Sequence, residues 1–380
     1  MVSKLKRATR EFDWLGLTCL AVIVAVGLAF LASASYRSGE LGQGSYLDFL
    51  RRQLVWIALG ICAFVFCAAI RYNWFVSNAY SFYLLCMLGI VAAFFFPGRA
   101  HRWLRFGSVS VQPSEFVKIA LVLALARYVT QVKNFRTFPR VLISLGLVAV
   151  PMALIVLQPD LGTAALLLPA LFAVLFVAGA RRKHLLAVAA LILLTGVIFL
   201  LMLPKHDYRR QRVSAFLRQS LLTEEERLAS GYQLEQAKIA IGSGGLKGKG
   251  WGKGTQNRLN YLPERHTDFI FAVVAEEGGF LAAGFLLLIY FLLFTSALSI
   301  AGRTRDPAGR VFVVGAVAIL FTQVFINVGM TMGLTPITGL TLPLVSYGGS
   351  SLLSSMVALG LIFNVGMRRV RVLAQDDFNE

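Results

Sequence analysis

The sequence has few of the residues that cover the surface of a soluble protein. Only 15% of its 380 residues are charged, whereas 57% are hydrophobic and 29 are Phe. A soluble domain of this size needs more polar surface to cover its core. The apolar residues instead fall in runs of roughly 17–25, the length of a helix that spans a bilayer. The composition excludes an ordinary soluble enzyme and predicts an all-α integral membrane protein.

Cysteine and histidine are also rare, with four residues of each type. No cysteine has a CxxC partner or a nearby His cluster, and all four lie inside apolar runs, where thiols are packing residues. They are Cys19, Cys62, Cys67 and Cys86. We expect neither a disulfide nor a zinc site.

Acidic residues are outnumbered by basic ones, which gives a net charge of +18. The Lys and Arg residues lie between the apolar runs rather than in a basic stripe interleaved with aromatic residues, so we do not expect nucleic-acid binding. Membrane proteins gather basic residues in their loops. The charge therefore agrees with the membrane interpretation.

The apolar runs predict a bundle of about ten transmembrane helices in a single polytopic membrane domain, residues 1–380. The predicted spans are about 14–34, 54–70, 79–97, 115–129, 141–157, 162–180, 184–203, 270–300, 311–330 and 350–367. The first run is too long for a signal peptide, so we expect it to be retained as a helix. The run at 270–300 is too long for one crossing, and its first turns are expected in or above the outer interface.

Loop charges predict the orientation. With the N-terminus in the cytoplasm, the inner segments are rich in Lys and Arg, as the positive-inside rule requires. These basic residues are Lys4, Lys6, Arg7, Arg10, Lys133, Arg136, Arg140, Arg181, Arg182, Lys183, Arg303, Arg305, Arg310, Arg368, Arg369 and Arg371. The outer loops at 158–161 and 331–349 have none, although those at 36–53 and 98–114 contain several arginines. We expect both termini in the cytoplasm and residues 204–267 as a large outer loop between spans seven and eight.

Ionisable residues at the ends of the spans are informative because they are few. Glu115 and Lys118 open the fourth span three residues apart, so they share a helix face and could pair. Gln158 and Asp160 join spans five and six, and Asp160 is close enough to the next helix to cap it.

Further polar groups precede spans eight and ten. His266, Thr267 and Asp268 lead into span eight, with Glu277 two turns further on, and Ser346 lies in the loop before span ten. In the predicted topology all of these residues lie at the outer ends of their spans. This gathering comes from separate parts of the chain and predicts a one-sided polar site.

The large outer loop adds two basic segments. Residues 206–212 contain Arg210 and Arg212, planar cations that suit phosphate oxygens. Residues 242–253, with Lys249, are rich in glycine and lysine and could hold backbone N–H groups against an anion. The run is not a Walker A loop, because Gly254 follows Lys253 where Ser or Thr is required.

Each feature also has a purely structural explanation. Glu115 and Lys118 could form an interface ion pair that orients a helix, and Asp160 and Asp268 could be N-caps. The glycine-rich runs could be turns or sites of close helix packing, and the 242–253 run a solvated loop. None of these explanations requires the polar groups to gather on one side of the membrane.

Chemistry outside the cell without ATP needs a substrate that carries its own leaving group. A lipid-linked glycosyl diphosphate qualifies, since Arg and Lys can stabilise the departing charge. The acceptor sugar hydroxyl needs a carboxylate base within hydrogen-bond reach, for which Asp268 is the best-placed candidate.

The chain resembles the SEDS glycosyltransferases, the shape, elongation, division and sporulation proteins. The resemblance covers essentially all ten spans. It is densest at 102–103, 112–118, 158–163, 210–212, 231–233, 241–254, 263–277 and 336–351. The Glu264-Arg265 pair before His266, and Ala275, resemble the elongation branch more than the division branch. Between Arg212 and residue 231 the chain departs from the family, since the usual Asp-Pro turn is missing.

The resemblance implies a peptidoglycan glycosyltransferase that polymerises lipid II during cell elongation, in the bacterial inner membrane. It implies that Asp268 is the catalytic base and that Arg102, Glu115, Lys118 and Asp160 support activity or cavity integrity. The implied partners are a class B penicillin-binding protein, other elongation-complex membrane proteins and membrane lipids. A divalent cation, Mg²⁺ or Mn²⁺, could bridge the diphosphate to Asp268 or Glu277.

Two other functions stay open from the sequence. A lipid II flippase would need a polar cavity reachable from both leaflets and lined near the midplane. A non-catalytic scaffold for the penicillin-binding protein would leave the gathering of polar residues unexplained.

Overall fold

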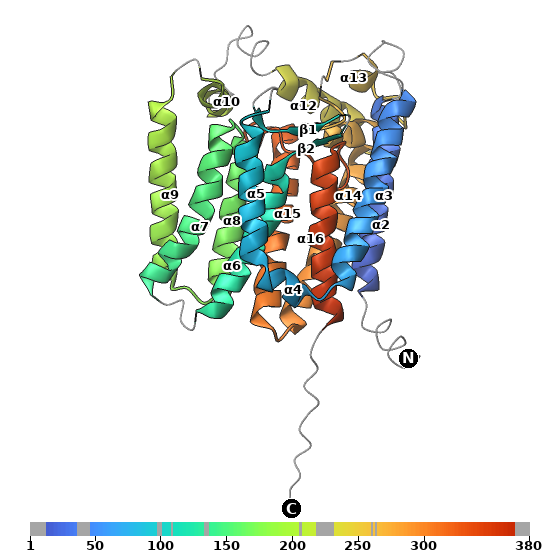
Figure 1. The fold of residues 1–380 in the computed structure, drawn as a ribbon. Helices are drawn as coiled ribbons and strands as arrows, with labels where there is room; N and C mark the ends of the chain where they lie inside the picture. The colour runs from blue at the N-terminus through green and yellow to red at the C-terminus, as the bar shows by residue number, and fades with distance from the viewer. Residues whose placement is uncertain are drawn as a thin grey trace, which may run out of the picture.

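The computed structural model is a bundle of long helices with a layer of short elements at one end (Figure 1). The structure describes residues 13–35, 46–96, 101–107, 109–132, 137–204, 207–217, 232–259, 261–262 and 264–368. Within these residues, ten long helices correspond to the ten predicted spans. They are α2 (Trp14–Ser35), α3 (Tyr46–Ala69), α5 (Ala79–Ala93), α6 (Pro113–Gln131), α7 (Phe138–Leu157), α8 (Leu161–Val177), α9 (Arg182–Met202), α14 (Ile270–Arg303), α15 (Pro307–Met332) and α16 (Gly349–Met367). The prediction of an all-α multi-pass membrane protein is confirmed.

Within the described residues, seven of these helices are long and apolar enough to span a membrane, and α5 and α8 are shorter apolar helices. Helix α6 differs because Glu115, Lys118 and Arg127 interrupt its apolar sequence. It lies inside the bundle, packed against α5, α8, α15 and α16. Glu115 and Lys118 are 5% and 3% exposed, so their charges face other helices rather than lipid. A helix with ionisable residues is tolerated in a membrane when those residues face the bundle interior.

Helix α16 packs chiefly against α3, and small residues permit the close approach. A Cβ atom on Gly360 would lie 2.6 Å from the carbonyl oxygen of Phe64, and one on Gly349 would overlap the indole ring of Trp56. Helix α3 begins at Tyr46, two turns earlier than predicted, so the predicted loop 36–53 is too long. Arg51, Arg52 and Gln53 made this stretch look like a loop, although it is helical.

Helix α14 is two helical segments joined at Gly279, whose φ of 70° and ψ of −169° are not helical. Only glycine adopts such a conformation without strain. Helix α14 packs against α2, α15 and α12 (Tyr232–Gly244). A Cβ atom on Gly244 would lie 2.0 Å from the carbonyl oxygen of Ala275, so α12 lies against the short segment before Gly279. The kink gives a structural reason for a run that exceeds one crossing.

The short elements gather at one end of the bundle, opposite the start of α2 and the end of α16 (Figure 1). They include α10 (Tyr208–Leu217), α12 and α13 (Thr255–Arg258), all from the predicted outer loop. Strands β1 (Leu104–Phe106) and β2 (Val109–Val111) form an antiparallel hairpin in which Leu104 pairs with Val111. The short α4 (Tyr72–Ser77) lies at the opposite end. The sequence predicted the outer layer but not the hairpin.

Candidate active site

Backbone contacts hold the segment that carries Asp268. The carbonyl oxygen of His266 accepts from the N–H of Tyr347 at 2.8 Å, and that of Thr267 accepts from Oγ of Ser346 at 2.5 Å. The carbonyl oxygen of Asp268 accepts from Nδ2 of Asn327 at 2.9 Å. Three consecutive carbonyls thus each have a donor from α15 or the loop before α16. These bonds hold residues 266–268, the segment before α14, in place.

Asp268 does not cap α14. Phe269 is the N-cap residue, and no side chain caps the helix there. Burial raises the pKa of the half-buried Asp268 to about 6, and Glu264 adds to the rise, while a hydrogen bond from Thr267 and the charge of Arg212 oppose it. Such a carboxylate is deprotonated at neutral pH and still basic enough to accept a proton.

Arg212 of α10 is the cation that faces this carboxylate. Its Nη1 donates to the carbonyl oxygen of Ile337 at 2.9 Å. Burial lowers the pKa of Arg212, and Asp268, Arg102 and Asp160 are the charged groups that influence it. The structure therefore brings four predicted site residues from four separate parts of the chain into one electrostatic cluster.

Asp160 and Arg102 hold the junction between α7 and α8 beside this cluster. Asp160 caps α8 as predicted, since its Oδ1 accepts from the N–H of Thr163 at 3.1 Å. Its Oδ2 accepts from Nε2 of Gln112 at 3.1 Å. Arg102 donates from Nε to the carbonyl oxygen of Gln158 at 2.6 Å and from Nη2 to that of Pro159. The carbonyl groups at the end of α7 thus receive the donors that they need.

Gln158 itself points away from this junction into the bundle. Its Nε2 donates to the carbonyl oxygen of Ile90 in α5 at 3.0 Å. The side chain is 2% exposed, so the amide links α7 to α5. The side chain of Gln158 therefore has a packing contact. Its backbone carbonyl, rather than its side chain, contacts Arg102 of the charged cluster.

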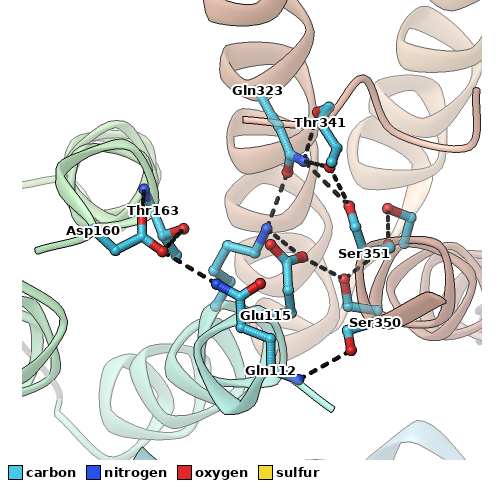
Figure 2. Close-up of polar contacts among 11 residues, drawn as sticks. Gln112, Glu115, Asp160, Thr163, Gln323, Thr341, Ser350 and Ser351 are labelled. Carbon is cyan, nitrogen blue, oxygen red and sulfur yellow. Dashed lines mark hydrogen bonds and ion pairs between the residues drawn. The ribbon is translucent and has the colours of Figure 1, made fainter. Parts of the chain in front are cut away.

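A second buried polar network lies among the helices (Figure 2). Nζ of Lys118 lies 2.8 Å from Glu115 and donates to Oε1 of Gln323 at 3.0 Å, so the predicted ion pair forms. Glu115 also accepts from Oγ of Ser354 at 3.0 Å. Nε2 of Gln323 in turn donates to the carbonyl oxygen of Thr341 at 3.0 Å. The network ties α6, α15, α16 and the loop before α16 together.

The glycine- and lysine-rich run 242–253 folds onto the kink of α14. The N–H groups of Lys249 and Gly250 donate to the carbonyl oxygens of Glu276 and Glu277 at 3.0 and 2.9 Å, and that of Gly252 donates to Oε2 of Glu277 at 3.1 Å. These groups have partners inside the protein. The prediction that the backbone of this run cradles an anion is therefore wrong for them.

The two glutamates at the kink have the same packing role. Lys249 Nζ lies 2.7 Å from Oε1 of Glu276, and Glu277 accepts from Oγ of Ser33 at 2.8 and 2.7 Å. Glu276 and Glu277 are 0% and 2% exposed. Lys249 and Glu277, predicted as cavity residues, thus join the outer loop to α14 and α2.

The remaining predicted residues have contacts of their own. Arg210 donates from Nη1 to the carbonyl oxygen of Leu203 at 2.6 Å, at the end of α9. The ring of His266 packs against Phe49, and burial lowers its pKa, which favours the neutral imidazole. Thr267 also donates to Oε2 of Glu264 at 3.1 Å. Residues 205–206 and 218–231 lie outside the described part of the chain, including most of the departure from the family.

Two residues of this site were missed by sequence reasoning. Gln323 and Asn327 are 1% and 0% exposed and lie one helical turn apart on α15. Their side chains are neutral, so a search for ionisable groups passes over them. The available signal was a pair of amides at i and i+4 inside an otherwise apolar run.

No cluster of three or more His, Cys, Asp or Glu side chains suitable for a metal occurs among the described residues. A separate cavity of about 530 Å³ lies between α14, α15 and α8, with apolar walls that include Tyr290, Phe294 and Phe321. Because its walls are apolar, the cavity contributes none of the groups that surround Asp268. The chemistry of the molecule is concentrated in the polar cluster.

The fold and the site define a multi-pass helical membrane protein with a buried polar cluster at one end of its bundle. The family model described as "Cell cycle protein", which covers FtsW, RodA and SpoVE, matches residues 13–370. The chain belongs to this family, the one that its motifs resemble.

Relatives agree over most of the chain. The peptidoglycan glycosyltransferase MrdB of Escherichia coli is 40% identical over 329 residues, 86% of this chain and 88% of MrdB. A solved structure of the rod shape determining protein RodA of Thermus thermophilus is 30% identical, covers 95% of this chain and 98% of RodA, and superposes with a TM-score of 0.69. A structure described as "Structural coordination of polymerization and crosslinking by a peptidoglycan synthase complex" gives a TM-score of 0.78 at 30% identity, with 95% and 99% of the two chains covered.

Proposed function

We propose that this chain is a peptidoglycan glycosyltransferase that polymerises lipid II into glycan strands at the outer face of the cytoplasmic membrane. The observation that carries the proposal is the carboxylate of Asp268, whose pKa is raised to about 6 and which has Arg212 as its cationic neighbour. The family and the relative named as a peptidoglycan glycosyltransferase support the same activity.

The two charged groups suit the two halves of glycosyl transfer. Asp268 takes the proton of the acceptor hydroxyl as that oxygen attacks the anomeric carbon of the donor sugar. The bond from this carbon to the diphosphate breaks, and the electron pair leaves with the diphosphate. Arg212 stabilises the negative charge that develops there. Arg102 and Asp160 hold the adjoining α7–α8 junction in place.

A divalent cation would add to this stabilisation if it bound the diphosphate. Phosphate oxygens and water usually supply most ligands of Mg²⁺, with one or two carboxylates from the protein. Asp268 is the carboxylate that fits this role. Glu277 is a poor second ligand for the cation, because its two carboxylate oxygens already accept from Oγ of Ser33 and one of them also accepts from the N–H of Gly252.

A class B penicillin-binding protein is the proposed partner, together with other membrane proteins of cell elongation and membrane lipids. The similar structure of a peptidoglycan synthase complex that coordinates polymerisation and crosslinking supports this assignment. The Glu264-Arg265 sequence before His266 and the similarity to a rod shape determining protein favour the elongation branch. The proposed location is the bacterial inner membrane, with both termini in the cytoplasm.

A lipid II flippase is the main alternative. It would use polar groups reachable from both sides, whereas the described charged cluster lies at the end of the bundle that carries α10, α12 and β1–β2. A non-catalytic scaffold would not need a carboxylate with a raised pKa. Both alternatives are less consistent with Asp268 than glycosyl transfer is.

The test is polymer formation from purified lipid II by the chain with its penicillin-binding partner. The Asp268→Asn variant, which has nearly the same shape, is expected to make no glycan polymer while it still binds the partner. Normal polymer yield from this variant would remove Asp268 from the mechanism. Movement of lipid II across vesicles by wild-type protein, without polymer, would support the flippase.

A further inference from the structure

Asn327 lies behind Asp268 in the structure and contacts both segments that shape its surroundings. Its Nδ2 donates to the carbonyl oxygen of Asp268 at 2.9 Å and to that of Leu340 at 2.7 Å. Leu340 follows Gly339, and a Cβ atom at Gly339 would lie 3.5 Å from Oδ2 of Asp268. The amide of Asn327 therefore holds the backbone of Asp268 and also the loop backbone at Leu340, next to the glycine that the carboxylate faces.

The chemistry of the contact requires an amide at this position. Both neighbours are carbonyl acceptors, so a side chain must offer two donors, and Asn presents them on one nitrogen. Its Oδ1 is buried without a hydrogen-bond partner, and the residue is 0% exposed. A buried acceptor without a partner is unfavourable. Asn327 thus makes both of its donor contacts although its Oδ1 has no hydrogen-bond donor.

We propose that Asn327 is a positioning residue for Asp268 in the proposed glycosyl transfer, and that it acts by clamping the 266–268 segment to residues 339–341. The proposal rests on the proposed function for its catalytic consequence, but the clamp is a property of the fold. Gln323, one turn earlier, donates to the carbonyl oxygen of Thr341 and extends the same support. The carboxylate of Asp268 accepts the proton, and Asn327 keeps this carboxylate in a fixed position relative to residues 339–341.

The test compares Asn327→Leu with a chemically matched control. Leu has the same branching at Cγ and the same number of side-chain heavy atoms but no donors, so the two carbonyl groups lose their partner. Asn364 of α16 is also 0% exposed and donates to two carbonyl oxygens, those of Cys67 and Ile70, at the other end of the bundle. Asn364→Leu therefore removes a similar buried clamp that has no contact with Asp268.

Steady-state kinetics with lipid II distinguish positioning from general loss of structure. We expect Asn327→Leu to lower kcat about a hundredfold, the effect of a misplacement of about 1 Å, with KM nearly unchanged. Asn327→Ser retains one hydroxyl donor and is expected to give an intermediate kcat. Asn364→Leu is expected to lower thermal stability but to keep the wild-type kcat per folded protein. A folded Asn327→Leu or Asn327→Ser variant with wild-type kcat would overturn the proposal.

Hydrogen–deuterium exchange of the full chain in nanodiscs supplies a readout besides activity. Amides in 264–272 and 337–343 are expected to exchange faster in Asn327→Leu than in wild type and to be unaffected in Asn364→Leu. Faster exchange across the whole bundle, or none at these segments, would overturn the clamp. If wild-type protein makes no polymer, the proposed function fails, and the exchange comparison still decides the role of Asn327.

Discussion

Asp268 and Arg212 meet at Gly339: a Cβ atom built on this glycine would lie 3.5 Å from Oδ2 of Asp268 and 4.0 Å from Nη1 of Arg212. The carboxylate comes from the segment before α14 and the guanidinium from α10. The absence of a side chain at residue 339 leaves the surface between the base and the cation open. A substrate group that contacts both Asp268 and Arg212 would lie over Gly339.

Gly339→Ala is expected to lower the rate of polymer formation by at least about tenfold, because its methyl group occupies this space. The residue has a φ of +76°, so Ala also costs about 1–2 kcal/mol of stability. Gly179→Ala is the control, since Gly179 has a φ of +78° and open space around its Cβ position. Equal activity of the two variants at equal folded concentration would contradict the role of Gly339.

The rate of polymer formation is expected to fall as the pH decreases through about 6. The pKa of Asp268 is raised to about 6, so the base becomes protonated in this range and cannot accept a proton. His266 is a second titratable group beside Asp268, and burial lowers its pKa from the ordinary histidine value. A pH–rate profile of His266→Gln separates the two: its midpoint should stay near 6. A midpoint that vanishes with His266 would assign the titration to the imidazole.

Asp268→Asn is expected to be more stable than wild type at neutral pH. The folded-state pKa of about 6 lies above the ordinary aspartate value of 3.8, so deprotonation destabilises the folded state as the pH rises from about 4 through 6. The amide has no such charge, and the expected difference is about 1–3 kcal/mol at pH 7.5. Thermal unfolding from pH 4 to 8 measures it. The difference should disappear near pH 4, and one that grows on acidification would contradict the raised pKa.

Gly279→Ala is expected to destabilise the protein by about 3 kcal/mol or more. At a φ of +70° its Cβ would lie 2.3 Å from the backbone nitrogen of Gly248, so the docked outer loop would have to move. Gly284→Ala, in the same helix with open space around it, should be neutral or slightly stabilising. Thermal unfolding of both variants in the same lipid tests the kink, and similar midpoints would contradict its role.

Lys249→Met is expected to destabilise the protein by about 2–3 kcal/mol, because the 0% exposed Glu276 loses its cation. Glu276 keeps the bonds from Thr255 and the N–H of Gln256. Adding Glu276→Gln removes the unpaired charge, so the double variant should recover part of the loss. A double-mutant cycle by chemical unfolding gives the coupling energy. Additive effects would mean that the ion pair does not hold the loop.

The apolar runs were sufficient to predict the helices that cross the membrane. Their lengths are fixed by the bilayer, and every backbone polar group in lipid has to be satisfied within a helix. The Glu115–Lys118 pair and the Asp160 cap were also predictable, because each joins residues three positions apart at the start of one helix. Local geometry is contained in the sequence.

For the glycine- and lysine-rich run, the partners of the N–H groups of Lys249, Gly250 and Gly252 were not predictable because they are distant in sequence. Its composition is compatible with an anion site and with close packing, and the backbone of Glu276 and Glu277 decides between them. Likewise, the early start of α3 was hidden by Arg51 and Arg52, whose charges resemble those of a loop. Composition alone does not separate such cases.

The sequence by itself determined that this protein lies in a membrane, that about ten long helices form its bundle and that Asp268 precedes one of them. Tertiary structure alone decided what surrounds that carboxylate: Arg212 from α10, Gly339 from a loop and Asn327 from the middle of α15. The physical reason is that helix formation and burial in lipid depend on neighbouring residues in the chain. A pKa raised by burial and a carbonyl held by an amide depend on groups that only folding brings together.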